Sequence, residues 1–246
     1  MDRYSDYDDF ARIYNRYWGG FSTQILPILE QLALKDVPEG VAILDLCCGA
    51  GQLASELTKR GYRVAGVDGS KPMLDYARMN APKAEFHLTD VRSLELPMVF
   101  DIALSTYDSL NHLLTLDDLR LVFHNVYRHL ATEGIFVFDM NLESGFQSRW
   151  RGNFNIWSDD TAVITESNYD EAEKLATVNI IIFTQNDGDE TLWRRNDVTL
   201  TQRAYSVDEL TRALARASFV EIEVFDAQRD FKMRDEGRAF FRAKKP

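Results

Sequence analysis

Between residues 41 and 139, short aliphatic segments alternate with segments of helical periodicity, and this alternation restricts the possible folds more than any other feature of the sequence. Strands separated by helices form βαβ units, whose strands lie parallel in a sheet that is covered by helices. The fold class is therefore predicted to be α/β, with a doubly wound sheet. The predicted strands cover residues 41–46, 62–67, 84–88, 101–105 and 135–139.

The helices between these strands carry start and stop signals. Residues 52–60 have helical periodicity and are followed by Gly61, a residue that accommodates the left-handed backbone found after a helix. Ser70 is predicted to cap the next helix through its side-chain oxygen. A third helix is predicted to begin near Thr115 and to end at Gly134.

Aromatic residues near the N-terminus recur at intervals of three and four positions, as on one face of an amphipathic helix. We expect residues 1–35 to form a helical cap that packs over the carboxyl edge of the sheet or on a neighbouring element. Side chains with this spacing usually pack in a core, and Tyr7, Phe10 and Trp18 are assigned that role. The aromatic residues are Tyr7, Phe10, Tyr14, Tyr17, Trp18 and Phe21.

The sequence beyond Met140 changes to a pattern typical of β-structure, rich in Val, Ile, Thr and aromatic residues. Asp187 and Gly188 favour a hairpin turn between two of its strands. We predict an antiparallel meander, added to the main sheet, that forms an inserted lid over residues 150–205. Its strands are predicted at residues 161–169, 174–184 and 191–201.

The C-terminal region is predicted to complete the same domain. Ser206 and Glu209 match the S-x-x-E capping box that opens a helix. Residues 220–225 and 238–242 have the composition of closing strands. Because the chain contains no internal repeat and no low-complexity linker, residues 1–246 are predicted to form a single domain.

Charge and hydropathy limit the partners. The chain has 39 acidic and 28 basic residues and a formal net charge of −11, which opposes binding to nucleic acid. No run of about eighteen apolar residues is present to span a bilayer, and the polar N-terminus is unlike a secretory signal. We therefore expect a cytoplasmic protein with no nucleic-acid or membrane partner; a homodimer remains open.

The sequence does not predict a metal site. Cys47 and Cys48 are the only cysteines, and no second pair of ligands completes a tetrahedral site. Adjacent cysteines rarely form a disulfide, because one peptide unit does not allow the required geometry without strain. His124 and His129 are five positions apart and do not share a helix face. We expect free thiols that pack in the interior, and no metal.

A glycine-rich turn, Gly49 and Gly51, follows the first predicted strand and precedes a helix. Glycines at such a turn allow backbone N–H groups to approach a ligand closely. With Ala54 and Asp68, the spacing also fits a dinucleotide-binding fingerprint loosely. On this turn alone, an NAD-dependent oxidoreductase is an alternative.

Acidic residues follow three successive strands, and they favour a different ligand. Asp45, Asp68 and Asp90 should meet along one crevice, because the carboxyl ends of parallel strands lie at the same edge of the sheet. Asp68 can accept two hydrogen bonds from a ribose diol, and Asp90 can accept one from an adenine amine, with Val91 and Met73 near the ring. Asp45 would help to hold a cationic group. These features predict a nucleoside ligand with a cationic tail.

Five segments in this order and spacing, DLCCGAG, VAGVDGSKPMLDYAR, HLTDVRSLEL, FDIALSTYDSLNHLL and LATEGIFVFDMN, resemble the motifs of class I S-adenosylmethionine-dependent methyltransferases. The resemblance extends from about Tyr7 to Asn141, and RAFFRAKK resembles the last strand of that family. It implies a Rossmann-like sheet of order 3-2-1-4-5-7-6 with the last strand antiparallel. One departure is Cys47, which stands where the family commonly has a glycine; we expect a slightly altered turn with binding retained.

The resemblance implies S-adenosylmethionine as cofactor and assigns a set of residues to it. Tyr14 corresponds to a tyrosine that reaches the cofactor in the family, and Ser105 and Tyr107 follow the fourth strand beside it. The non-catalytic alternative is a module that keeps the cofactor pocket without transferring a methyl group. The implied cofactor-binding residues are Tyr14, Asp45, Cys47, Gly49, Gly51, Asp68, Gly69, Met73, Asp90, Val91, Ser105 and Tyr107.

The segment STYDSLNHLL is similar to the acceptor-facing segment of small-molecule N-methyltransferases, of the amino-sugar or glycine type. The resemblance implies a small-molecule acceptor, with His112 and Tyr107 as catalytic residues and Asp108 and Asn111 nearby. His112 would orient or deprotonate an amine or hydroxyl. Its structural alternative is to cap a helix or bond a backbone carbonyl. The identity of the acceptor, and whether N, O or C is methylated, are left open by the sequence.

Overall fold

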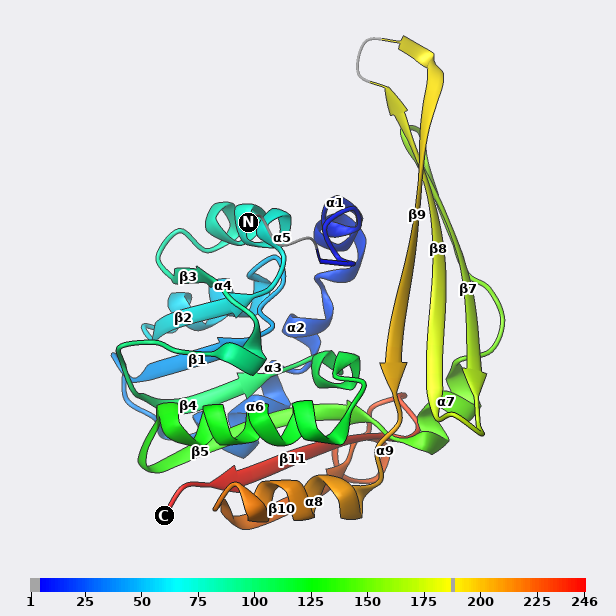
Figure 1. Ribbon diagram of the computed structural model, residues 1–246. Coiled ribbons are helices and arrows are strands. Elements are labelled where there is room, and N and C mark those ends of the chain that lie inside the picture. The colour runs from blue at the N-terminus through cyan, green and yellow to red at the C-terminus, as the bar shows by residue number, and fades with distance from the viewer. Residues whose placement is uncertain (1–4, 187–188) are drawn as a thin grey trace.

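A seven-stranded sheet forms the centre of the computed structural model, which describes residues 5–186 and 189–246. The strand order is β10-β11-β5-β4-β1-β2-β3, and β11 runs antiparallel to the other six strands (Figure 1). Strands β6 to β9 belong to a second sheet. When β10 and β11 are counted as the sixth and seventh strands of the main sheet, the order read from β3 is the predicted 3-2-1-4-5-7-6. The strands are β1 Ala42–Leu46, β2 Arg63–Asp68, β3 Glu85–Leu88, β4 Phe100–Ser105, β5 Leu130–Asn141, β10 Val220–Asp226 and β11 Arg238–Lys244.

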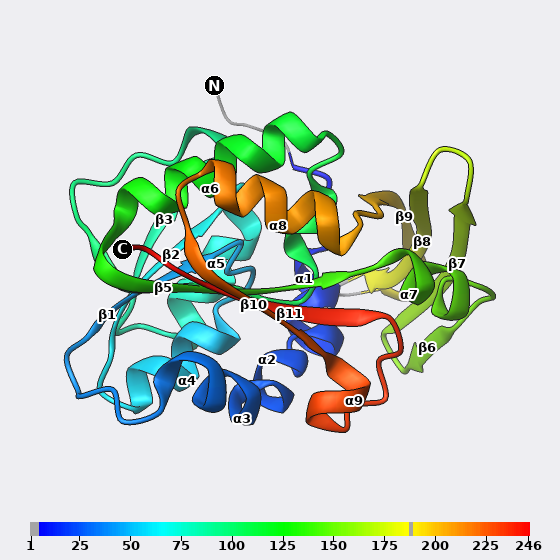
Figure 2. The same ribbon diagram turned by 90° about the horizontal axis from the view of Figure 1, so that it is seen from below.

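Helices cover both faces of this sheet, as the prediction of a doubly wound fold required (Figure 2). Alternate residues of one strand point to opposite faces: Leu44 packs in the core beneath α6 and α8, and Ile43 packs beneath α3 and α4. All side chains of β1 are therefore buried. The helices are α3 Leu26–Leu29, α4 Gln52–Lys59, α5 Lys71–Asn80, α6 Leu116–His129, α7 Glu143–Arg149, α8 Val207–Arg216 and α9 Ala227–Phe231.

The predicted helix caps are present. The side-chain oxygen of Ser70 accepts from the backbone N–H of Met73, and Ser206 and Glu209 form a reciprocal capping box. The predicted stop at Gly134 is wrong, because α6 ends at His129 and Gly134 lies within β5. A Cβ atom at Gly134 would lie 2.8 Å from the carbonyl oxygen of Ala131, so a close backbone approach accounts for this glycine.

The N-terminal aromatic segment is broken into short pieces and does not form one continuous helix. The aromatic side chains from Tyr7 to Trp18 belong to the apolar cluster on the second sheet, in which Phe10 and Ile13 pack with Val163, Ile180 and Val198. Two π-helical turns interrupt the regular helical periodicity. The pieces are α1 Ala11–Ile13, the π-turn Tyr14–Trp18, α2 Phe21–Gln24, α3, and the π-turn Glu30–Leu34.

The inserted strands form a separate antiparallel sheet of order β6-β7-β8-β9, so the prediction that the meander joins the main sheet is wrong. Both edges of β5 are already paired, with β4 and β11, and the apolar face of the meander is covered by the N-terminal segment. This sheet stands beside the main domain and projects beyond it (Figure 1). The predicted turn at Asp187 and Gly188 lies outside the described residues. The strands are β6 Asn155–Ser158, β7 Thr161–Asp170, β8 Leu175–Asn186 and β9 Asp189–Arg203.

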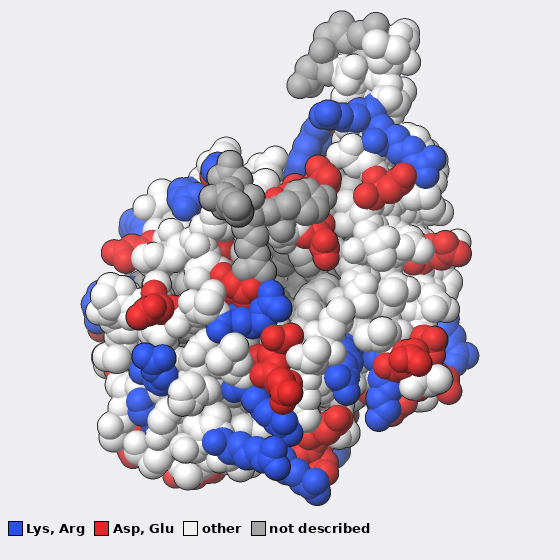
Figure 3. All heavy atoms as spheres, in the orientation of Figure 1, with Lys and Arg blue, Asp and Glu red and all other residues white. Residues whose placement is uncertain are grey.

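Among the described residues, no helix combines the length and apolarity needed to cross a bilayer. On the face shown in Figure 3, acidic and basic side chains are interspersed over the body of the molecule.

Candidate functional site

A cavity of about 930 Å³ lies between the carboxyl ends of the main strands, the N-terminal segment and the second sheet. One end is lined by residues that follow β1 and β2, including Cys47, Gly49 and Asp68. The other end is lined by His112 and by residues of β7, β8 and β9. The turns after β1 and β2 and the strands of the second sheet, which are far apart in the sequence, therefore line the same cavity. The cavity lies at the edge of the main sheet where ligands bind in open α/β folds.

The turn after β1 has an unusual backbone. Cys47, Gly49 and Gly51 all adopt positive φ angles, of 54°, 52° and 76°. A Cβ atom at Gly49 would lie 3.2 Å from the ring of Tyr14, and one at Gly51 would lie 2.9 Å from Ala77. Gly49 thus keeps the turn open beneath Tyr14, whereas Gly51 allows helix–turn packing. The expected altered turn at Cys47 takes the form of a left-handed residue that glycine would occupy with less strain.

The two cysteines have different environments. Both are free. Cys48 is buried and packs with Leu74, Ala77 and Phe86, as expected, but Cys47 is only partly buried and lines the cavity. Burial raises the pKa of the Cys47 thiol, and nearby Asp68 raises it further, so the thiol is neutral. The Cys47 side chain therefore presents a small, uncharged surface to the cavity beside the turn.

The carboxylate of Asp68 is held in place by the backbone. Its two oxygens accept from the N–H groups of Gly49, at 3.0 Å, and Ser70, at 2.8 Å. Asp90 lines the same cavity and accepts from Arg92 at 2.6 Å. Two of the three acids thus face one space.

Asp45 and Ser105 lie behind the cavity wall. Both are 1% exposed, and Oδ2 of Asp45 and Oγ of Ser105 are buried without a hydrogen-bond partner. Burial and the neighbouring Asp68 raise the pKa of Asp45 to about 8. A buried polar atom without a partner is costly, and a positive charge on a ligand in the adjacent part of the cavity would offset that cost electrostatically. These orphaned oxygens therefore fit a cofactor with a cationic head near the glycine turn.

Most of the sequence-predicted site residues line the cavity, including the predicted catalytic pair His112 and Tyr107. Asp45, Gly51 and Ser105 lie behind its wall. The lining residues from the predicted set are Tyr14, Cys47, Gly49, Asp68, Gly69, Met73, Asp90, Val91, Tyr107 and His112.

The loop after β4 is held by a buried carboxylate that the sequence did not single out. Tyr107 and Asp108 both have positive φ angles, of 66° and 47°. Their N–H groups donate to Asp139, at 2.7 and 3.0 Å, and this compensates for a backbone that non-glycine residues rarely adopt. Asp139 in turn pairs with Arg238.

Arg238 is the second residue that the sequence analysis missed. Its guanidinium is 3% exposed and donates to Asp108 at 2.6 Å. Burial alone would lower the pKa of Arg238, but Asp108 and Asp139 raise it, so the group stays charged. Burial would likewise raise the pKa of Asp108, but Arg238 lowers it below its ordinary value. A signal was present in the sequence: an arginine opens a strand that is otherwise largely apolar.

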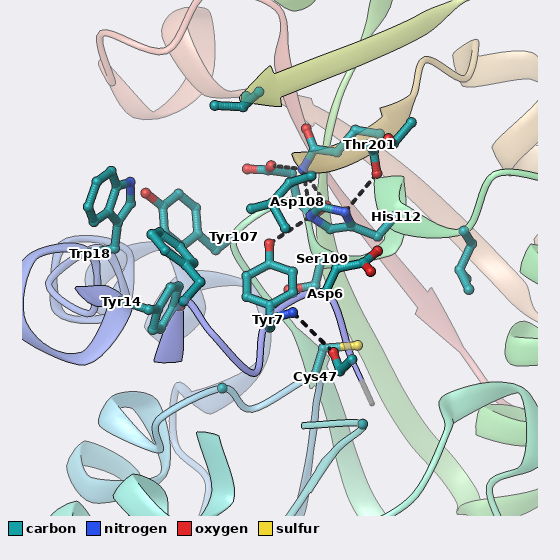
Figure 4. A pocket seen from close by; sticks show the side chains of 18 of the residues that line it. Asp6, Tyr7, Tyr14, Trp18, Cys47, Tyr107, Asp108, Ser109, His112 and Thr201 are labelled. Atoms are coloured by element: carbon teal, nitrogen blue, oxygen red, sulfur yellow. Dashed lines mark hydrogen bonds between the residues drawn. The ribbon is translucent and has the colours of Figure 1, made fainter. Parts of the chain in front are cut away.

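His112 has hydrogen bonds at both ring nitrogens. Nδ1 lies 2.8 Å from the carbonyl oxygen of Thr201, and Nε2 lies 2.8 Å from the hydroxyl of Tyr7 (Figure 4). Nε2 is also 3.2 Å from the side-chain nitrogen of Gln202. Because a carbonyl only accepts, Nδ1 carries the proton and Nε2 is the acceptor. Burial lowers the pKa of His112, so this neutral form prevails.

Tyr7 lines the cavity, although its spacing predicted a core contact. The position of its hydroxyl depends on His112, which is 105 residues away, and local periodicity carries no such information. Arg149, at the end of α7, and Trp150, which follows it, also line the cavity. Trp157 is 72% exposed.

The histidines of α6 do not form a metal site. The Nδ1 atom of His129 bonds the carbonyl of Asn125, and its Nε2 accepts from the N–H of Leu96. Across residues 5–186 and 189–246, no cluster of three potential metal ligands is found.

Comparison with known proteins gives this site a family context. Residues 43–134 match the family described as a methyltransferase domain. A Bacillus subtilis protein with the name "Putative methyltransferase YqeM" is 29% identical over 74% of this chain and 75% of its own length. A Saccharopolyspora spinosa enzyme, dTDP-4-amino-2,3,4,6-tetradeoxy-D-glucose N,N-dimethyltransferase, is 29% identical over 54% of this chain and 52% of its own.

Solved structures share the fold over nearly the whole chain. An S-adenosylmethionine-dependent methyltransferase from Clostridium acetobutylicum superimposes with a TM-score of 0.78 at 23% identity, covering 98% of this chain and 99% of that one. DesVI of Streptomyces venezuelae has a TM-score of 0.77 at 20% identity, covering 99% and 100%. Residues 43–134 thus match a methyltransferase domain, and the chain as a whole has the fold of solved methyltransferases. Two further solved methyltransferases that share this fold, at 19% and 17% identity, contain S-adenosylmethionine and sinefungin, and both are consistent with the predicted family resemblance and cofactor.

Proposed function

We propose that this enzyme transfers a methyl group to the nitrogen of a small amine, with an amino sugar as the preferred class. The observation that carries the proposal is the single cavity that joins the glycine turn to His112. A transferable methyl group and an acceptor must lie about 3 Å apart and in line, so both must share one enclosed space. In this cavity, a neutral imidazole lies close to an ionised carboxylate, Asp108.

The cofactor end is proposed to hold S-adenosylmethionine through residues already fixed in position. Asp68 would accept from the ribose hydroxyls, and Tyr14 would lie over the glycine turn. Asp45 would be ionised by a nearby ammonium group, which would remove the cost of its burial. When bound, the cofactor supplies an electrophilic methyl group: the acceptor's lone pair forms the new N–C bond as the S–C bond breaks and leaves its electron pair on sulfur.

The acceptor end has two unlike walls. Val178, Ile180 and Leu200 from the second sheet provide an apolar surface, and Asp108 and His112 provide a polar one. A ring with few hydroxyl groups and one amine would satisfy both walls. The named substrates of two relatives, dTDP-linked amino sugars with several deoxy positions, have this character. Residues 150–205 are proposed to act as the lid over such an acceptor, and residues 1–35 as the cap over the cofactor.

Methyl-labelled S-adenosylmethionine provides the test. The full chain would be incubated with dTDP-3-amino-3,4,6-trideoxy-α-D-glucopyranose, glycine and the matching hydroxyl compounds, and the label followed by mass spectrometry. We expect label on an amine, and His112→Asn should lower turnover much more than cofactor affinity. His124→Asn, an exposed histidine on α6, is the matched control. Label on hydroxyl compounds alone would contradict the proposal, and label on no compound would favour a non-catalytic binding module.

A further inference from the structure

The direction of the hydrogen bond between Tyr7 and His112 follows from the rest of the network. Nδ1 of His112 donates to the carbonyl of Thr201, so Nε2 has only a lone pair to offer. The Tyr7 hydroxyl, 2.8 Å away, must therefore be the donor. Its oxygen keeps lone pairs that are not used by His112, and Tyr7 itself lines the cavity.

Both ring nitrogens of His112 are thus occupied before an acceptor arrives. The Nε2 lone pair receives Tyr7 and lies 3.2 Å from the amide nitrogen of Gln202, which also donates to Asp108 at 2.6 Å. An acceptor amine would reach this lone pair only by displacing Tyr7. The Tyr7 oxygen needs no such rearrangement to accept an N–H group.

We infer that Tyr7 is a further catalytic residue, and that its hydroxyl takes the proton of the methylated amine while passing its own proton to His112. The inference rests on the proposed amine acceptor. In this relay, the N–H bond of the methylated ammonium breaks and its electron pair stays on nitrogen. The proton bonds to Oη of Tyr7, the original Tyr7 O–H bond breaks, and that proton bonds to Nε2 of His112. The imidazolium later releases its proton to solvent.

The surroundings of His112 suit a transient positive charge. Asp108 and Asp6 both favour the charged ring electrostatically, and the carbonyl of Thr201 keeps its hydrogen bond in either state. Burial raises the pKa of Tyr7 well above its ordinary value, and neighbouring Tyr14 and Asp108 raise it further. A free tyrosinate is therefore unfavourable, and the two proton transfers must be coupled.

Tyr7 is also held in position. Its ring packs edge-on against His112, with 5.4 Å between centroids, and next to Phe10 at 6.0 Å. The adjacent Asp8 accepts from the hydroxyl of Ser70 at 2.6 Å, which ties this segment to the start of α5. Figure 4 shows the Tyr7 hydroxyl directed at the His112 ring from the N-terminal segment. The relay is therefore preorganised.

Kinetics provide the first test, with Tyr7→Phe compared with Tyr17→Phe. Tyr17 is on the same segment, but its hydroxyl lies 3.0 Å from Oγ of Ser158 on the second sheet. With dTDP-3-amino-3,4,6-trideoxy-α-D-glucopyranose as probe, we expect Tyr7→Phe to lower kcat by about 10²-fold and to raise KM much less, through the lost hydrogen bond to the acceptor, with the affinity for S-adenosylhomocysteine unchanged. Wild-type turnover should fall as the pH drops through the pKa of His112, and the variant should lose this limb. Tyr17→Phe should match the wild type.

Nuclear magnetic resonance of ¹⁵N-histidine-labelled protein provides a second test that needs no acceptor. The His112 signal, assigned by its loss in His112→Asn, should show the Nδ1–H tautomer. In Tyr7→Phe the pKa of His112 should rise, because the neutral ring loses a donor; Tyr17→Phe should leave it unchanged. An unshifted His112 pKa, or full turnover in Tyr7→Phe, overturns the relay while leaving methyl transfer intact. Absence of transfer to any amine overturns the proposed function and the relay with it.

Discussion

Arg238 on the last strand donates to Asp108 at 2.6 Å, although 130 positions separate them in the sequence, and both side chains are buried. The same guanidinium pairs with Asp139, whose carboxylate holds the backbone of the loop after β4. The final strand therefore determines the conformation of a loop that lines the cavity. Replacing one charge in this cluster should affect stability strongly, because the remaining charges would stay buried without a partner.

We predict that Arg238→Met lowers the free energy of unfolding by about 3–5 kcal/mol. Urea denaturation measures the change. Arg229→Met is the control, since Arg229 pairs with Asp230 at the surface and its loss should have little effect. Arg238→Lys, which keeps the charge but not the fork of donors, should fall between the two. Equal stabilities of Arg238→Met and the control would show that the cluster is not a stabilising unit.

The adjacent cysteines should respond in opposite directions to glycine. Cys47 has a φ angle of 54°, which costs a non-glycine residue about 1 kcal/mol or more, so Cys47→Gly should leave stability unchanged or raise it by up to about 1 kcal/mol. Cys48 is absent from the positive-φ residues and packs in the interior, so Cys48→Gly should lower stability by about 1–2 kcal/mol. Thermal unfolding of the two variants checks this. A larger loss in Cys47→Gly than in Cys48→Gly would refute the strain argument.

The main sheet could be predicted from sequence because its signals are local. Aliphatic segments, helix caps such as Ser70, and glycines after helices act over a few residues, and the predicted strand order follows from the family resemblance. The pairing of the meander was not predictable in this way. Alternation of apolar residues indicates strands but not which sheet they join, and the separate sheet depends on cover from Phe10 and Ile13.

Within the site, residues on the glycine turn and at strand ends were accessible to sequence reasoning, since the edge of a parallel sheet brings them together. Tyr7 and Asp139 gave no such signal, and the signal of Arg238, an arginine at the start of a largely apolar strand, did not identify its partner. Each depends on a partner far along the chain, and each also fits an ordinary structural pattern: an aromatic stripe, a strand residue and a strand start. Asp45 is the opposite case. The sequence predicted that this strand-end acid lines the cavity, whereas the side chain lies behind the cavity wall.

Tyr14 should contribute to cofactor affinity through its hydroxyl. Its ring lies beside Gly49, at the cofactor end of the cavity. We expect Tyr14→Phe to weaken binding of S-adenosylhomocysteine by about 1 kcal/mol, as for one hydrogen bond, because the ring contact is kept. Isothermal calorimetry measures the affinity, with Tyr17→Phe as the control on the same segment. If both variants bind as tightly as the wild type, Tyr14 acts only by packing.

Asp45 should make stability depend on pH in the sense opposite to that of most carboxylates. Its pKa is raised from an ordinary value of 3.8 to about 8, chiefly by burial. Between these values the folded protein holds a proton that the unfolded chain has released. Stability from this group is therefore lost as the pH rises toward 8, by at most about 1.4 kcal/mol per pH unit.

Asp45→Asn has no proton to lose, so its stability relative to the wild type should increase from about pH 5 to pH 8 and then level off. Urea denaturation of both proteins without cofactor, at several pH values in this range, measures the difference between their free energies of unfolding. Because the two proteins share all other titrating groups, the contributions of those groups largely cancel. A constant difference would mean that Asp45 is already ionised in the folded protein. In that case the unpaired Oδ2 atom of Asp45, behind the glycine turn, could no longer be explained by a neutral carboxyl group that ionises when a cationic ligand binds.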